Sequence, residues 1–195
     1  RNSKLETRNS KLILASSSPR RVELLRNAGI PFTVEPADVP EVRRPLESPE
    51  EFARRVACEK ADKVLARYPD KFVLGADTVV ISNSQVLGKP SDPQDAARML
   101  RLLSGGSHLV TTGVCLLGPD FEDTRAETTT VSFSPLSEVE IAEYIATGEP
   151  MDKAGAYAIQ GIASRWVTHL DGCYFNVMGL PVPLVYRLLR EHGVM

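Results

Sequence analysis

Apolar positions along the chain follow two spacings, one typical of strands and one typical of helices. Short runs rich in aliphatic and β-branched residues predict strands at residues 11–15, 32–34, 71–82, 85–87, 108–117 and 124–133. Between them, apolar residues recur at helical spacing in stretches that begin near residues 18, 48, 92, 137 and 181. Because turns typical of hairpins and helical connections both occur in this order, we expect an α/β fold with a mixed, twisted sheet flanked by helices.

Local signals mark where several of these elements begin. Ser18-Pro19 predicts an N-cap followed by proline at the first helical position. The residues Ser48–Glu51 have the pattern of a capping box. Near the C-terminal end, Asp171-Gly172 separates the runs 165–170 and 173–177, and this dipeptide predicts a β-hairpin between two short strands.

Charge and hydropathy exclude several classes of protein. The 23 Lys and Arg residues against 25 Asp and Glu residues give a formal charge of −2, so we expect no nucleic-acid partner. No apolar run approaches the roughly 20 residues of a membrane span. The first residues of the chain are too polar for a signal peptide. We therefore expect a cytoplasmic protein with no membrane partner.

Two further features limit the domain organisation. The three cysteines, Cys58, Cys115 and Cys173, are odd in number and widely spaced, which indicates neither a disulfide framework nor a zinc motif. The pentapeptide RNSKL occurs at residues 1–5 and again at residues 8–12, and we do not interpret it as a structural repeat. We expect residues 1–10 to form an extension outside the fold and residues 11–195 to form a single domain.

Some polar residues are costly for folding alone and mark candidate functional positions. Ser16–Ser18 precede a helix whose first turn carries Arg20 and Arg21. A helix N-terminus has unpaired N–H groups and a partial positive charge, so it attracts phosphate, whereas arginines oppose its dipole unless an anion lies there. The same pattern is compatible with a capped helix that carries two solvated arginines.

Two charged residues fall where apolar residues are expected. Lys60 lies at the centre of the apolar stripe of its predicted helix, as either a cation aimed into a cleft or a lysine that snorkels to the surface. Asp77 lies within an apolar strand, where a carboxylate is costly unless it is paired or bound to metal. We interpret Asp77 as a catalytic base or a metal ligand, with capping of a neighbouring loop as the alternative.

The segment 152–161 brackets Asp152, Lys153 and Gln160 with small residues. This pattern is typical of a backbone that lies close to a ligand, or of a tight turn. Lys89 is not a P-loop lysine, because GxxxxGK[ST] is absent from the sequence. GxGxxG, HExxH and GxSxG are absent as well, which disfavours dinucleotide oxidoreductases, zincin proteases and α/β-hydrolases.

Taken in order, these features resemble the Maf family of nucleoside triphosphate pyrophosphatases. The resemblance covers about residues 11–192, and the ordered set is more specific than any single motif. The motifs are SSSPRR at 16–21, EKA at 59–61, GADT at 75–78, GKP at 88–90, SG at 104–105, TG at 112–113 and DKAGAYAIQG at 152–161.

The resemblance implies a fold similar to the inosine triphosphate pyrophosphatases, with two lobes around a cleft. It also implies a hydrolase that converts a nucleoside triphosphate to the monophosphate and pyrophosphate with Mg²⁺ or Mn²⁺. The arginine pair after SxSP and the IQG ending resemble the branch of the family that acts on dTTP and UTP. The sequence does not decide between these two substrates.

Roles for individual residues follow from the resemblance. Asp77 would be the general base that activates water, and Glu41, in a polar loop, would hold the metal together with Asp77. Phosphate contacts would come from Ser16, Ser18, Arg20, Arg21, Lys60 and Lys89. Specificity would depend on Arg20, Thr78 and Gln160, and the Gln160 amide suits a pyrimidine edge that carries O4 and N3–H. Asp152 and Lys153 are further site candidates.

Two residues depart from the family pattern. Pro40 stands where the family places an acid directly before Glu41, which removes one carboxylate from the predicted metal site. Ala158 stands where glycine is usual, and we expect a small effect, because the added Cβ is unfavourable only where the backbone needs a positive φ.

Two other functions stay open at this point. One is a pyrophosphatase for a modified nucleotide such as 7-methyl-GTP. The other is a non-catalytic, nucleotide-binding regulator of cell division. A homodimer is the expected assembly.

Overall fold

The computed structural model describes residues 10–195 and divides the chain into two compact units. Unit 1 comprises the described residues up to Asp77 together with Thr112–Glu127 and Gly179–Met195, and unit 2 comprises Thr78–Thr111 and Thr128–Met178. Residues 1–9 of the expected extension lie outside the described residues. Ser10 already belongs to the fold, because it is buried and its hydroxyl donates a 2.9 Å hydrogen bond to the Pro31 carbonyl.

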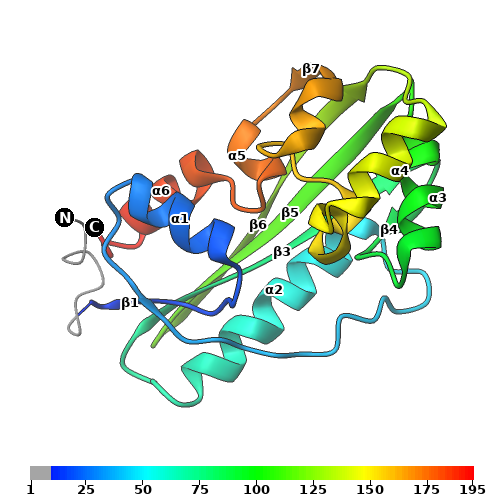
Figure 1. The fold of residues 1–195 in the computed structure, drawn as a ribbon. Helices are drawn as coiled ribbons and strands as arrows, with labels where there is room; N and C mark the ends of the chain where they lie inside the picture. The colour runs from blue at the N-terminus through cyan, green and yellow to red at the C-terminus, as the bar shows by residue number, and fades with distance from the viewer. Residues whose placement is uncertain (1–9) are drawn as a thin grey trace. The chain divides into compact units, whose positions relative to one another are not determined.

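The strands form a seven-stranded mixed sheet in the order β2-β1-β3-β5-β6-β7, with β4 paired to β3. Figure 1 labels all of these strands except β2. Pairing is parallel between β1 and β2 and between β1 and β3, and antiparallel in the β3–β4 and β6–β7 pairs. This pairing confirms the expected mixed sheet. The strands are β1 Leu12–Leu14, β2 Thr33–Val34, β3 Phe72–Ser82, β4 Gln85–Leu87, β5 Ser107–Gly118, β6 Phe121–Phe133 and β7 Val167–Asp171.

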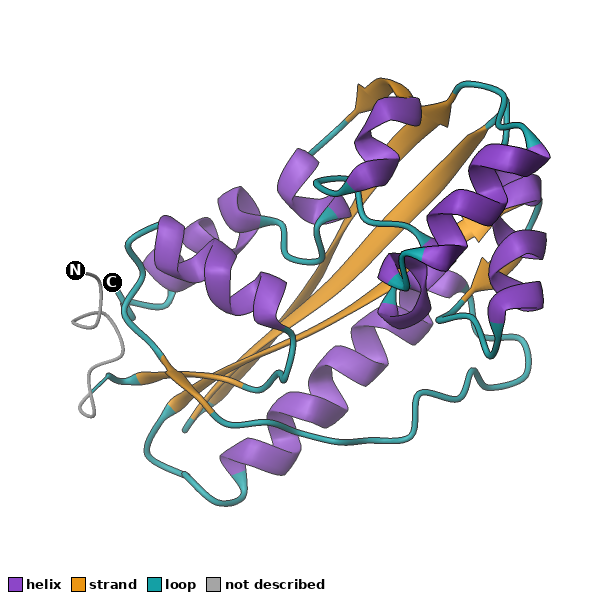
Figure 2. Ribbon diagram, in the orientation of Figure 1, coloured by secondary structure: helices purple, strands orange, loops and turns teal. Residues whose placement is uncertain are grey.

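Five of the six α-helices of the described residues begin within a residue of the predicted start. Figure 2 shows the helices in purple. Capping boxes are present at Ser48 and Ser137, and Ser18 is an N-cap followed by Pro19. The α-helices are α1 Pro19–Asn27, α2 Pro49–Leu65, α3 Pro93–Leu103, α4 Glu138–Ala146, α5 Tyr174–Val177 and α6 Val182–Glu191. Three 3₁₀ helices follow α4, namely η1 Glu149–Asp152, η2 Ala154–Ala156 and η3 Ile162–Trp166. Within the described residues, no helix is both long and apolar enough to cross a membrane.

In unit 1, α2 lies unusually close to the sheet because two strand residues lack a side chain. A Cβ added at Gly75 of β3 would lie 2.0 Å from the Ala57 carbonyl oxygen, and one at Gly113 of β5 would lie 2.4 Å from the Ala53 carbonyl carbon. Apolar residues of α2 pack against apolar residues of β1, β3 and β5 in a common core. This close packing fixes the height at which the other side chains of α2 stand above the strands.

Unit 2 has a separate core that is rich in aromatic residues. Phe133, Tyr144, Tyr157 and Trp166 are buried together with aliphatic residues of α3, β5 and β6. Its hairpin between β3 and β4 turns at Asn83-Ser84, where both residues have positive φ. The strands predicted at residues 71–82 and 85–87 are thus joined as a hairpin.

The hairpin predicted at Asp171-Gly172 is wrong. Residues 173–177 are not a strand; they form the short helix α5, and β7 pairs with β6 instead. The Thr129 hydroxyl exchanges hydrogen bonds with the backbone N–H and carbonyl of Cys173, at 3.0 and 3.1 Å. The buried Asn176 amide donates to the Val110 carbonyl and to Thr129 Oγ1, at 2.9 Å each. These side-chain bonds satisfy the segment without a strand partner.

Candidate active site

The candidate site is built around a buried ion pair in unit 1. Lys60 Nζ on α2 lies 2.7 Å from Asp77 Oδ1 on β3 and 2.7 Å from Glu41 Oε1 in the loop before α2. The Lys60 and Asp77 side chains are only 8% and 9% exposed, whereas Glu41 is 46% exposed. The sequence places these three residues far apart, and the structure brings them together. Lys60 therefore neither snorkels nor stands alone, because two carboxylates share its ammonium group.

Burial sets the protonation behaviour of Asp77. Desolvation raises the pKa of this carboxyl above its ordinary value, and the Lys60 ammonium and the Arg21 guanidinium oppose that rise. A buried pair of this kind contributes little to stability, because removing both charges from water costs nearly as much as their attraction returns. Such a carboxylate is a group from which a proton-transfer role is expected.

The start of α1 forms a second part of the site, also in unit 1. Ser16 is buried, and its Oγ accepts hydrogen bonds from the Ser18 N–H at 3.2 Å and from Arg21 Nη1 at 3.3 Å. Arg21 is itself buried, and its Nε donates to the Gly179 carbonyl at 2.7 Å. Burial lowers the pKa of this guanidinium. Arg20 is half-buried.

One detail of this helix start differs from the prediction made from the sequence. Ser18 is the N-cap, but its hydroxyl makes no capping hydrogen bond within the described residues. Ser16 instead fixes the turn, two residues earlier. The first-turn N–H groups of α1 therefore have no serine side chain bonded across them, which is the arrangement that an anion-binding helix start requires.

Sequence reasoning missed how the Glu41 loop is held. Arg55 on α2 donates to both carboxylate oxygens of Glu47, at 2.6 and 2.9 Å, and to the Val42 carbonyl at 3.0 Å. The paired guanidinium lowers the pKa of Glu47 to about 2. Arg55 also pairs with Glu59 one turn later at 2.9 Å. In the sequence, the only sign that Arg55 is held in place is its i,i+4 spacing from Glu59.

The remaining predicted residues lie in unit 2. Thr78 is half-buried on β3, Lys89 is exposed after β4, and Gln160 is exposed after η2. Lys153 forms an ion pair with Asp152 and donates to the Glu149 carbonyl at 3.3 Å. Lys153 and Glu149 lie at the two ends of the turn that contains η1, so the Lys153 ammonium contacts its own turn.

The backbone of the segment 152–161 is held in a bent conformation. Gly155 has φ +71°, and its N–H donates to the Gly88 carbonyl at 3.0 Å. Ala156 also has a positive φ of 60°, whereas Ala158 is not among the residues with positive φ. The Cβ of Ala158 is therefore accommodated, in agreement with the small effect expected for this departure.

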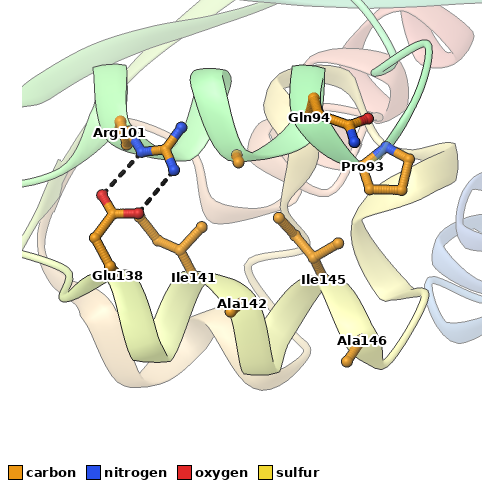
Figure 3. Close-up of a pocket in the computed structure, with 9 residues that line it drawn as sticks. Pro93, Gln94, Arg101, Glu138, Ile141, Ala142, Ile145 and Ala146 are labelled. Carbon is orange, nitrogen blue, oxygen red and sulfur yellow. Dashed lines mark hydrogen bonds and ion pairs between the residues drawn. The ribbon is translucent and has the colours of Figure 1, made fainter.

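A separate hollow in unit 2 contains none of the predicted site residues. It has a volume of about 350 Å³ and lies between α3 and α4, with Ile141, Ala142 and Ile145 along its α4 side (Figure 3). Arg101 and Glu138 pair at its edge through hydrogen bonds of 2.8 and 2.7 Å. The hollow is mainly apolar, so it does not suit a triphosphate.

The chain is similar to known proteins in both sequence and fold. The chain matches the profile of the Maf-like protein family over residues 11–192. It is 59% identical over 184 residues to the dTTP/UTP pyrophosphatase of Koribacter versatilis, covering 94% of this chain and 95% of that protein. The dTTP/UTP pyrophosphatase of Symbiobacterium thermophilum is 51% identical over 182 residues, covering 93% and 94% of the two chains.

The solved structure of the Staphylococcus aureus Ham1 protein has a similar fold. The TM-score is 0.50 at 13% sequence identity, and the match covers 93% of this chain and 98% of that one. This likeness confirms the predicted fold class. The family match over nearly the whole length shows that the chain belongs to the Maf-like protein family.

Proposed function

We propose that this chain hydrolyses dTTP and UTP to the nucleoside monophosphate and pyrophosphate, with Asp77 as the general base. The observation that carries the proposal is the buried Lys60 ammonium held 2.7 Å from both Asp77 and Glu41. The relatives at 59% and 51% identity are named dTTP/UTP pyrophosphatases, which supports the same substrates here.

Binding of the triphosphate relies on fixed positive groups. The start of α1 offers its N–H groups and Ser18, while Ser16 and the Gly179 carbonyl orient Arg21. Lys60 and Arg20 add charge in unit 1, and Lys89 adds charge in unit 2. Cations positioned in advance stabilise the charge that develops on the phosphate oxygens during attack.

Asp77 supplies the base. Its carboxylate takes a proton from water, the water oxygen forms a bond to phosphorus, and the α–β phosphoanhydride bond breaks with pyrophosphate as the leaving group. The raised pKa of Asp77 makes this carboxylate a stronger proton acceptor than a solvated aspartate. Lys60 keeps the carboxylate oriented through its 2.7 Å hydrogen bond.

The donor atoms at this position fit Mg²⁺ or Mn²⁺. Asp77 and Glu41 offer carboxylate oxygens, which these hard cations prefer, and both already share one positive group. When bound, the metal would neutralise phosphate charge and lower the pKa of water. Because Pro40 directly precedes Glu41, Asp77 and Glu41 are the two carboxylates that would hold the metal.

Specificity is assigned to Arg20, Thr78 and Gln160. Gln160 is exposed and ends a segment that the Gly155–Gly88 hydrogen bond holds in place. Its amide can donate to O4 and accept from N3–H of uracil or thymine, whereas cytosine presents the opposite pattern. Rejection of CTP follows from this match.

A substrate panel tests the proposal. The purified protein is incubated with Mg²⁺ or Mn²⁺ and each common NTP and dNTP, with 7-methyl-GTP included, and pyrophosphate and monophosphate are measured. We expect turnover of dTTP and UTP and poor turnover of CTP. Gln160→Ala should reduce this discrimination, and Gln85→Ala, at another exposed glutamine, should not. Turnover of 7-methyl-GTP alone would replace the substrate assignment, and nucleotide binding without any turnover would favour a regulatory protein.

A further inference from the structure

Two thiols, a hydroxyl and a carboxylate converge in unit 1. Cys58 Sγ, Cys115 Sγ and a Glu122 carboxylate oxygen all lie within 4.8 Å of one another. Thr124 Oγ1 stands beside them, 2.9 Å from Cys58 Sγ and 3.4 Å from Cys115 Sγ. Cys58 is on α2, Cys115 on β5, and Glu122 and Thr124 on β6, so three elements contribute to one cluster.

The backbone brings these groups together. Cys115 lies two residues after Gly113 on β5 and therefore on the same face of the strand. A Cβ at Gly113 would lie 2.4 to 2.5 Å from backbone atoms of Ala53 and Arg54, so α2 approaches this face as closely as backbones allow. Arg54 Nη2 also donates to the Thr124 carbonyl at 3.2 Å and ties α2 to β6. The packing thus brings the two cysteine side chains together before any ligand arrives.

This cluster is distinct from the Lys60 site, although both use α2. Cys58 and Lys60 are two positions apart, which places them about 200° apart around a helix. Lys60 contacts Asp77 and Glu41, and Cys58 contacts Thr124 and Glu122. Neither acid of the Lys60 site belongs to the cysteine cluster.

The chemistry of the donors selects the ligand. Sulfur donors favour soft or borderline cations, whereas Mg²⁺ and Mn²⁺ prefer oxygen. Zn²⁺ binds cysteine sulfur at about 2.3 Å and carboxylate oxygen at about 2.0–2.2 Å in tetrahedral sites, which requires donor atoms roughly 3.5–4 Å apart. The observed spread of at most 4.8 Å is close to this spacing.

We infer that Cys58, Cys115 and Glu122 form a binding site for a thiophilic divalent cation of the Zn²⁺ type. Glu122 is exposed, so water would reach the bound cation and could supply a further ligand. Bound metal would join α2 to β5 and β6 and stabilise unit 1. The inference does not depend on the proposed pyrophosphatase activity.

Cobalt provides a direct readout of thiolate coordination. The full chain is reduced, treated with a chelator, desalted and titrated with Co²⁺ and then Zn²⁺. We expect a thiolate-to-cobalt charge-transfer band that saturates at one equivalent per chain and disappears when Zn²⁺ is added. Zn²⁺ should also raise the Tm. Cys173→Ser, which changes the cysteine outside the cluster, and Asp77→Asn should leave the band unchanged.

Variants of the cluster decide the outcome. Cys58→Ser should abolish the band, and Glu122→Gln, at an exposed position, should weaken Zn²⁺ binding by about tenfold or more while circular dichroism shows an intact fold. Absence of the band, or its persistence in Cys58→Ser, would overturn the inference. A Cys58–Cys115 disulfide in a protein whose reduced form binds no metal would identify the pair as a redox pair instead.

Discussion

Units 1 and 2 bury different kinds of polar groups. The buried charged side chains of the described residues, Arg21, Lys60 and Asp77, all belong to unit 1. The buried polar residues of unit 2 are Ser82, His108, Thr111, Thr129 and Asn176. His108 is neutral at pH 7, because burial lowers its pKa to about 4. Unit 2 therefore buries polar groups without charge.

This difference distinguishes the polar groups that serve catalysis from those that serve folding. A buried neutral group that is hydrogen-bonded costs little, whereas a buried charge costs free energy even when it is paired. In unit 2 the polar groups explain local structure, as Thr129 and Asn176 do for α5. In unit 1 the buried charges are not needed for folding. We therefore propose that the catalytic residues belong to this unit.

The largest effect on stability is expected where α2 meets β3, the contact that sets the height of Lys60. Gly75→Ala would place a Cβ 2.0 Å from the Ala57 carbonyl oxygen, and neither backbone can move without disturbing the core of unit 1. We expect a loss of more than about 3 kcal/mol in the free energy of unfolding. Chemical denaturation measures it. Gly106→Ala, whose Cβ would have its nearest neighbour at 3.9 Å, is the matched control and should be nearly neutral.

The next effect is a pH dependence located in unit 2. His108 Nε2 lies 2.8 Å from the Tyr157 hydroxyl, and burial holds the His108 pKa near 4 against an ordinary 6.5. Because the unfolded state binds this proton more readily, stability is complete above about pH 6.5 and falls as the pH drops towards 4. The loss is at most about 3 kcal/mol.

Comparison of wild type with His108→Gln isolates this contribution. The variant should be less stable at pH 7, and its deficit should shrink as the pH falls to 4, because only the wild type loses stability through His108. Exposed His169 serves as the control, since His169→Gln should show the same pH dependence as wild type. A deficit that stays constant with pH would mean that His108 is not buried in its neutral form.

The smallest effect concerns the loop that carries Glu41. Arg55→Ala removes the bonds to Glu47 and to the Val42 carbonyl. The Arg55 and Glu47 side chains are only 16% and 10% exposed, so the pair lies between a surface and a buried ion pair, and we expect a loss of about 1–2 kcal/mol in stability. Activity should fall modestly through a raised KM. Arg187→Ala, at an exposed position of α6, should change neither quantity.

Much of the fold is local and could be predicted. Caps, prolines and alternating apolar residues identify α1 to α4, α6 and the long strands, because these signals act within a few residues. The element 173–177 could not be predicted, since its helical turn depends on Thr129 and Asn176 contacts between distant segments. The same holds for Ser16, whose hydroxyl accepts from the Ser18 N–H, while the Ser18 hydroxyl makes no capping bond within the described residues.

The sequence identifies the unusual residues of the candidate site, but it does not show which of them lie close together in space. A lysine in an apolar stripe and an aspartate in an apolar strand stand out in the sequence, but their 2.7 Å contact depends on Gly75, which lets α2 approach β3. The meeting of Cys58 and Cys115 was missed for the same reason. Their separation in sequence conceals a proximity that the packing at Gly113 creates.

One comparison tests most directly whether the buried charge of unit 1 serves catalysis. Asp77→Asn and Asp123→Asn each neutralise a carboxylate of unit 1, and Asp123 pairs with Arg125 at 2.8 Å and His192 at 3.0 Å. Initial rates of pyrophosphate release from dTTP and Tm values are measured for both variants and the wild type. Asp77→Asn should lower kcat by about 10²–10⁴ while it stays folded, because the amide oxygen can still accept from Lys60. Asp123→Asn should keep its kcat. A fully active Asp77→Asn protein, or equal losses in both variants, would contradict the account.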